Sequence, residues 1–258
     1  MLVFCHLFVG SAIGLAVSGR MDERRLGRAG LAGGFLPDLL DKPLGHLLLT
    51  QTLDNGRLVG HSLLFLFVLL AAGAILHRER GGVAGFVLAL GVLSHQLLDA
   101  MWRDPIAWCF PFLGPFVPGH YPDFFVEGLM AEIGSLTEWI FGAATLALLF
   151  TVARSASAPE HLDTTGLSIT RLLAAAVGFM GVLSLAGATG ILPPLAEISG
   201  TGDSLILATA AVVSSAIVLA KMHDGAGREV MQELRQAQLV QDDHTGKERG
   251  RHERAEGP

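Results

Sequence analysis

The sequence predicts an all-α, polytopic integral membrane protein: a helix bundle with about seven transmembrane or re-entrant helices. Its composition is the first indication, because hydrophobic residues make up 51% of the 258 residues and charged residues only 16%. The second is that apolar stretches of about 17 to 20 residues recur along the chain, each long enough to cross a bilayer core of about 30 Å.

These stretches give the order of the predicted helices. They lie at about residues 2–18, 31–50, 60–76, 83–102, 135–153, 170–190 and 203–221. The first has no basic residue before its apolar run, so we expect a retained helix and not a cleaved signal sequence.

The stretch at 31–50 differs from the others because prolines and charged residues interrupt it. These are Pro37, Asp38, Asp41, Lys42 and Pro43. Lipid does not tolerate such a group, so we expect this helix to be shielded by protein, broken or re-entrant.

Basic residues predict the orientation. They concentrate in alternate connections: Arg20, Arg24, Arg25 and Arg28, then Arg78 and Arg80, then Arg154 and Arg171, then Lys221 and the tail. Such connections are cytoplasmic, so we expect an amino terminus outside and a carboxyl terminus inside the cell (inner) membrane.

Three regions follow from this reading. Residues 1–154 form a membrane-embedded domain, residues 155–222 add two transmembrane helices, and residues 223–258 form a polar cytoplasmic tail, disordered beyond a short helix near 231–240.

The net charge of −6 and the lack of a basic stripe argue against nucleic acid as a partner and leave membrane lipids. The two cysteines, Cys5 and Cys109, fit neither a disulfide framework nor a paired-cysteine zinc site.

Ionisable residues in the predicted helices carry the functional signal. His6, Asp38, His61, His95 and Asp99 all fall toward the non-cytoplasmic ends of their helices in the predicted orientation, or in the interrupted stretch. His95 and Asp99 are four residues apart, so they share a helix face about 6 Å apart and can bind one ion. Histidine nitrogen with carboxylate oxygen suits zinc first, or manganese or iron, better than calcium.

Each of these residues also has a structural explanation. His61 precedes Ser62 at a helix start and would be solvated in the interface, and His95 with Asp99 would form a hydrogen-bonded packing pair. Glu132 leads into the helix at 135–153 and is either a proton-transfer group or simply solvated.

A set of short motifs, in order, resembles the YdjM-like family of membrane-bound proteins described as metal-dependent hydrolases. The motifs are His6, Gly34-Phe-Leu-Pro-Asp-Leu-Leu-Asp-Lys-Pro43, Gly60-His-Ser62, Ser94-His-Gln-Leu-Leu-Asp99, Trp108 and Pro111. The resemblance covers roughly residues 1–150, and the motif order is also distantly similar to that of zinc-dependent phospholipases C.

The resemblance implies hydrolysis of an ester or phosphodiester, in a lipid or another amphiphile, by water that a metal ion activates by lowering its pKa from about 16 to about 7. The implied ligands are His6, Asp38, His61, His95 and Asp99, and the implied proton-transfer groups are Asp41 and Glu132. Many relatives have Pro-Asp-x-Asp-His where this chain has Pro37-Asp-Leu-Leu-Asp-Lys42. Asp41 is therefore either a ligand or a partner of Lys42.

Two other functions stay open. An ion-coupled carrier also places carboxylates and histidines in broken helices, although its sites lie near the membrane midplane between internal repeats, and we find no repeat. A non-catalytic membrane scaffold would use the same residues only to join helices. The oligomeric state does not follow from the sequence.

Overall fold

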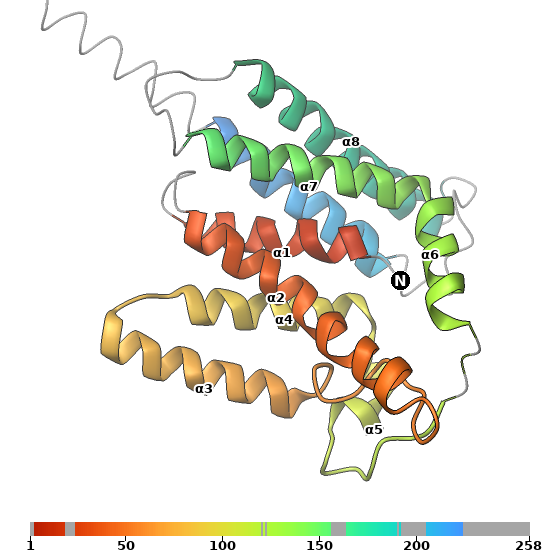
Figure 1. The fold of residues 1–258 in the computed structure, drawn as a ribbon. Coiled ribbons are helices and arrows are strands. Elements are labelled where there is room, and N and C mark those ends of the chain that lie inside the picture. The colour runs from red at the N-terminus through yellow and green to blue at the C-terminus, as the bar shows by residue number, and fades with distance from the viewer. Residues whose placement is uncertain are drawn as a thin grey trace, which may run out of the picture.

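The computed structural model describes residues 3–18, 24–119, 121, 123–155, 164–189, 191 and 205–223. Every regular element in this part of the chain is a helix (Figure 1). The elements are α1 (Val3–Val17), α2 (Arg24–Pro43), η1 (Leu44–Leu48), α3 (Leu63–Arg80), α4 (Ala84–Leu98), η2 (Met101–Arg103), α5 (Pro105–Trp108), α6 (Phe124–Gly134), α7 (Leu136–Ser155) and α8 (Thr164–Ala188), followed by a helix over Leu205–His223. The predicted helix near 231–240 and the rest of the tail after His223 lie outside the described residues.

The fold confirms a membrane helix bundle but not the count of seven spans. Three described helices are long and apolar enough to cross a membrane, at Leu136–Ala153, Gly166–Ala188 and Leu205–His223. Val3–Val17 and Ala84–Leu98 are apolar but shorter. The predicted span at 31–50 corresponds to α2 with η1, and the one at 60–76 corresponds to α3. Both carry too many charged residues to count among the apolar helices that could cross a membrane.

Helix α2 is shielded, which was one of the three outcomes expected for the interrupted stretch. It begins at Arg24, continues through Pro37, and passes at Pro43 into the wider turns of η1. It packs against α1 on one side and α4 on the other, as Figure 1 shows. Asp38 and Asp41 are therefore buried against protein, where partners can satisfy them.

Two hydrophobic clusters hold the helices together. The larger one joins α1, α7, α8 and the helix at 205–223, with Phe8, Leu148, Val177 and Val218 all buried within it. The smaller one joins α3 and α4 and includes the buried Val92. The helices after residue 155 thus pack into the same core as α1.

Glycines set the separation of α1 and α2. A Cβ on Gly10 would lie 2.3 Å from the carbonyl oxygen of Gly30, and a Cβ on Gly34 would lie 2.4 Å from the carbonyl oxygen of His6. Larger residues at these positions would force the two helices apart. This crossing brings the amino-terminal half of α1 against the middle of α2.

Candidate metal centre

Three segments of the chain, namely α2, the loop before α3 and the carboxyl end of α4, meet at one group of side chains that could hold a metal ion. Asp38 comes from α2, His61 from the loop before α3, His95 from the last turn of α4, and Asp99 from the residue that ends α4. One ligand atom from each of these residues lies within 4.8 Å of all the others. The structure therefore brings together four of the five ligands expected from the sequence.

The distances within this group match the spacing of atoms around one ion. The Nε2 atoms of His61 and His95 are 3.1 Å apart. Asp38 Oδ1 lies 3.7 Å from His61 Nε2 and 3.6 Å from His95 Nε2. Asp99 Oδ2 lies 3.6 Å and 3.9 Å from the same two nitrogens. Ligands about 2.0–2.2 Å from a tetrahedral ion lie about 3.3–3.6 Å from one another.

His95 is held in one tautomer by the backbone of α2. Its Nδ1 donates to the carbonyl oxygen of Gly34 over 2.8 Å, and the ring is fully buried. Since a carbonyl oxygen only accepts, the proton of a neutral His95 lies on Nδ1, and Nε2 presents a lone pair to the group.

His61 is held in the same way by Asp41. The Nδ1 of His61 donates to Asp41 Oδ2 over 2.8 Å, which leaves Nε2 to face His95. Asp41 is fully buried and also accepts backbone N–H groups from Leu58 at 2.7 Å, Gly60 at 2.8 Å and His61 at 3.0 Å. These contacts fix the loop that carries His61.

The two candidate roles of Asp41, ligand or partner of Lys42, can be compared with its position. Asp41 lies outside the group of four ligand atoms, one hydrogen bond behind His61. Lys42 instead pairs with Asp38 Oδ2. The arrangement of Asp41, His61 and the ligand group is that of a carboxylate that orients a metal-binding histidine.

His6, the fifth expected ligand, contacts the group through Asp99. Its Nε2 lies 3.1 Å from Asp99 Oδ1, and its ring stacks on that of His95 with ring centroids 4.0 Å apart. Its Nδ1 is buried and has no hydrogen-bond partner among the described residues. His6 thus orients Asp99 from α1, and the close crossing at Gly34 brings it there.

Glu132, the other expected proton-transfer residue, lies at the amino end of α1 beside Glu138 and is not part of the group. Its Oε1 accepts the backbone N–H of Val3 at 3.4 Å, and Glu138 Oε2 accepts that of Phe4 at 2.8 Å. Carboxylates at this position compensate the free N–H groups and the positive end of a helix.

Arg57 and Gln96 belong to the site although the sequence did not single them out. The Arg57 guanidinium lies 3.3 Å from the carbonyl oxygen of Asp99 and 3.8 Å from its Oδ2, and its side chain is 43% exposed. Gln96 is buried; it donates to the carbonyl oxygen of Ser62 and accepts the Trp108 indole N–H at 3.1 Å. For Gln96 the sequence did hold a signal, because Gln96 directly follows His95 in a quoted motif and Trp108, its hydrogen-bond partner, follows in the same series of motifs.

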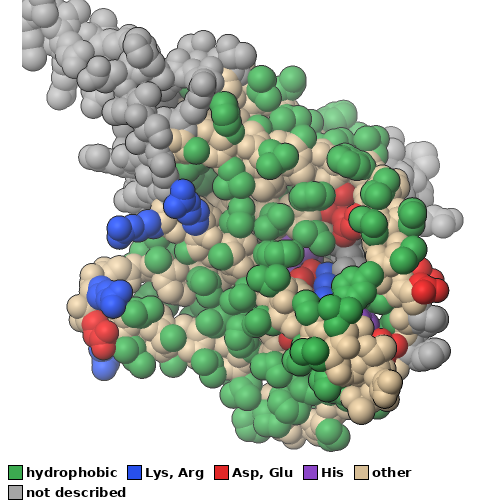
Figure 2. Space-filling model, viewed as in Figure 1, with side chains coloured by type: hydrophobic (Ala, Val, Ile, Leu, Met, Phe, Trp, Pro, Cys, Tyr) green, Lys and Arg blue, Asp and Glu red, His purple; other side chains and the backbone are tan. Residues whose placement is uncertain are grey.

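The site is enclosed except at Asp99. His6, Asp38, His61 and His95 are all at most 5% exposed, whereas the Asp99 side chain is 23% exposed. Figure 2 shows histidine, acidic and basic side chains together in a recess between hydrophobic ones. The side with Asp99 and Arg57 is therefore the open side of the site.

The chemistry of the donor set fits a divalent ion. The bonds to Asp41 and Gly34 leave two imidazole lone pairs facing each other at 3.1 Å, next to two carboxylates. Such an arrangement needs a proton or a cation between the nitrogens. Two nitrogens and two oxygens are a ligand set that zinc accepts, and manganese and iron are the alternatives.

One of three comparisons with known proteins gives a match. No curated protein and no solved structure gives a significant match to the chain. The family model of the YdjM inner membrane proteins, in contrast, matches residues 1–163. This range includes every residue of the site and more than half of the chain. The chain therefore belongs to the YdjM inner membrane protein family.

Proposed function

We propose that the protein is a membrane-embedded, metal-dependent hydrolase that cleaves an ester or phosphodiester bond in a lipid or another amphiphile. The observation that carries the proposal is the convergence of Asp38, His61, His95 and Asp99 on one point, in a protein of an inner membrane family. A divalent ion held there would supply Lewis-acid polarisation of the scissile bond and activation of water.

The residues around the ligands have positioning roles in this proposal. Asp41 and the Gly34 carbonyl keep the Nε2 atoms of the two histidines free of protons, and His6 holds the Asp99 carboxylate. Asp41 is poorly placed to exchange protons with a substrate, because it is fully buried and its oxygens already accept four hydrogen bonds. Glu132, the other candidate for proton transfer, lies beside Glu138 at the amino end of α1 and outside the ligand group, so the proposal gives it no step.

The charges at the site favour an anionic substrate. Asp38, Asp41 and Asp99 bring three negative charges, and Lys42 and Arg57 bring two positive ones. A divalent ion with neutral histidines would leave the site with one net positive charge. Arg57 lies at the exposed side, where its guanidinium could bind a phosphate oxygen. A phosphodiester therefore suits the site better than a neutral carboxylic ester.

The surface beside the site suits an amphiphile. The loop at 49–62 carries His61 and is joined to the loop at 109–121 by a hydrogen bond from Asn55 to Val117 and another between Gly119 and Leu53. Phe112 in the second loop is 83% exposed, and Leu48 next to the first is 77% exposed. Apolar side chains exposed around a polar recess are suited to contact lipid at the membrane surface.

Metal analysis and a hydrolysis screen on the purified protein test the proposal. We expect stoichiometric zinc, manganese or iron in the wild type, and cleavage of a lipid phosphodiester or ester. His95→Ala and Asp99→Asn should each deplete the metal and abolish cleavage, because each removes a ligand. His77→Ala is the control, since His77 is exposed near the end of α3.

Two results would count against the proposal. If both site variants kept full metal and full activity, the ligand assignment would be wrong. If the wild type held no metal and the variants failed to fold, the cluster would be a packing device only.

Arg57→Gln separates the phosphodiester from the neutral ester. It should raise KM for an anionic substrate about tenfold or more and leave the metal content unchanged, because a charge-assisted hydrogen bond is lost while all ligands remain. An unchanged KM would exclude Arg57 from substrate binding.

A further inference from the structure

A cavity lies toward the opposite end of α1 from the candidate metal centre. It measures about 310 Å³ and lies between α1, α2 and α7, lined by residues that include Ser11, Leu15, Arg28, Leu31 and Leu148. Leu15 follows His6 by nine residues on the same helix, which places it about 14 Å further along the axis. The cavity is therefore separate from the metal centre.

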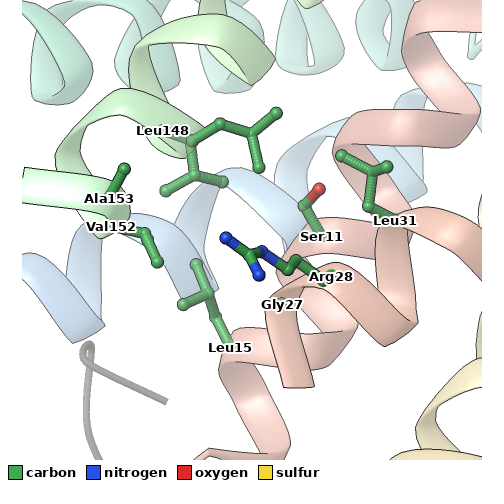
Figure 3. Close-up of a pocket in the computed structure, with 9 residues that line it drawn as sticks. Ser11, Leu15, Gly27, Arg28, Leu31, Leu148, Val152 and Ala153 are labelled. Carbon is green, nitrogen blue, oxygen red and sulfur yellow. The ribbon is translucent and has the colours of Figure 1, made fainter. Parts of the chain in front are cut away.

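The cavity combines an apolar lining with one charged group. Figure 3 shows the Arg28 guanidinium extending into the space between Leu15, Leu148 and Val152. The other polar side chain among the described lining residues, Ser11, already donates to the carbonyl oxygen of Leu7 at 2.8 Å. Ligand cavities have this character, with mostly apolar walls and a few polar groups that fix orientation.

Among the residues that the structure describes, Arg28 has no hydrogen-bond or ion-pair partner, unlike Lys221 at the same end of α1. Lys221 donates to the carbonyl oxygen of Ser18 at 2.6 Å. For Arg28, no ion pair or hydrogen bond lies within the described ranges, and its side chain is exposed. Arg25, one turn earlier on α2, adds a second positive charge close by. The positive charge of Arg28 is therefore available to an anion from outside the described helices.

Gly27 shows that the cavity can admit further atoms. Its backbone is buried, yet a Cβ built on it would meet no atom within 4 Å. Gly27 also lines the cavity. A buried position with open space beside it means that the neighbouring helices do not fill this region.

We propose that this cavity binds an anionic phospholipid, with the phosphate on Arg28 and part of one acyl chain between Leu15, Leu31 and Leu148. The apolar walls complement the chain, and the guanidinium complements the phosphate through paired hydrogen bonds. Basic groups between membrane helices bind lipid head groups in this manner. The bound lipid would join α2 to α7, the first described helix that is both long and apolar enough to cross a membrane.

Titration of the purified full-length protein with phosphatidylglycerol or phosphatidylcholine of identical acyl chains, read out by native mass spectrometry, tests this site. We expect the wild type to bind one phosphatidylglycerol at least about tenfold more tightly than phosphatidylcholine. Arg28→Gln should remove this preference. Arg25→Gln is the matched control: it removes the same charge one turn away, outside the cavity lining, and should keep the preference.

Gly27→Leu tests the cavity itself with Arg28 intact. The added side chain should occupy the space and weaken binding of both lipids about tenfold, while a melting temperature like that of the wild type shows that the helices still pack. Equal effects of Arg28→Gln and Arg25→Gln would overturn the proposal, because the attraction would then be diffuse. No preference in the wild type, or no effect of Gly27→Leu, would overturn it as well.

Discussion

The Nε2 atoms of His61 and His95 lie 3.1 Å apart, although 34 residues separate the two histidines in the chain. Each ring is fixed from behind by its Nδ1, through Asp41 in one case and the Gly34 carbonyl in the other. The two nitrogens therefore face each other, and either a proton or a metal cation between them would satisfy both.

Metal binding should weaken as the pH falls. Each histidine ligand must be free of a proton at Nε2, so binding releases protons and acid reverses it. We expect the metal affinity of the wild type, measured by competition with a chelator, to fall steadily from pH 8 to pH 5. His95→Ala has one such histidine fewer and should show lower affinity with a shallower pH dependence. A pH-independent affinity would argue against histidine ligation.

Asp41→Asn should lower the metal affinity by about 10- to 100-fold, the usual effect of changing a group that orients a ligand histidine. Asparagine keeps one acceptor for the backbone N–H groups but cannot stabilise His61 through a charge. Metal titration measures the affinity, and thermal unfolding in detergent measures whether the variant keeps its stability.

Asp104→Asn is the control for that variant. Asp104 also caps local backbone, by accepting the N–H of Ala107, but lies outside the ligand group. If the two substitutions had equal effects on metal affinity, Asp41 would have no special relation to the site.

Gly34→Ala should disrupt the site through the backbone. The new Cβ would lie 2.4 Å from the carbonyl oxygen of His6, so α1 must move away from α2. We expect a loss of stability of about 1–3 kcal/mol, the usual cost of overpacking, together with a lower metal affinity. Gly82→Ala is the control, because a Cβ there meets nothing within 4 Å. Similar unfolding temperatures for the two variants would show that the helix crossing adapts freely.

The predicted orientation can be tested at the two ends of α4. Leu113 follows its carboxyl end and Arg80 precedes its amino end, and both are exposed. With Cys5 and Cys109 replaced by serine, Leu113→Cys should react with a membrane-impermeant thiol reagent in intact cells, and Arg80→Cys should react only after lysis. The reverse pattern would place the metal centre at the cytoplasmic side.

Hydropathy predicted the long helices well because lipid contact requires continuous apolar surface. The predicted stretches at 135–153 and 170–190 correspond to α7 and α8, with ends that differ by a few residues. The start of α2 at Arg24 was missed, because its first turns are polar and it packs through glycines, which hydropathy does not register. The paired spacings of Gly10 with Gly14 and of Gly30 with Gly34 were the signal for this crossing.

The sequence motifs singled out Asp38, His61, His95 and Asp99, which the structure brings together, because the residue types that can bind a metal are visible in the sequence itself. They could not assign Asp41 or find Arg57, since both depend on the path of the loop at 49–62. The three N–H groups that bind Asp41 come from this loop, and the same loop carries Arg57 to Asp99. Loop geometry depends on tertiary contacts that one sequence does not reveal.

During synthesis, His6 enters the membrane long before its partner Asp99 has been made, since 93 residues separate them. Asp41 is likewise made before the backbone N–H groups of residues 58–61 that it binds, and His95 is made later still. Lipid strongly disfavours carboxylates that lack partners. We therefore expect the nascent helices α1 to α4 to stay together beside the insertion machinery and to enter the bilayer as one unit.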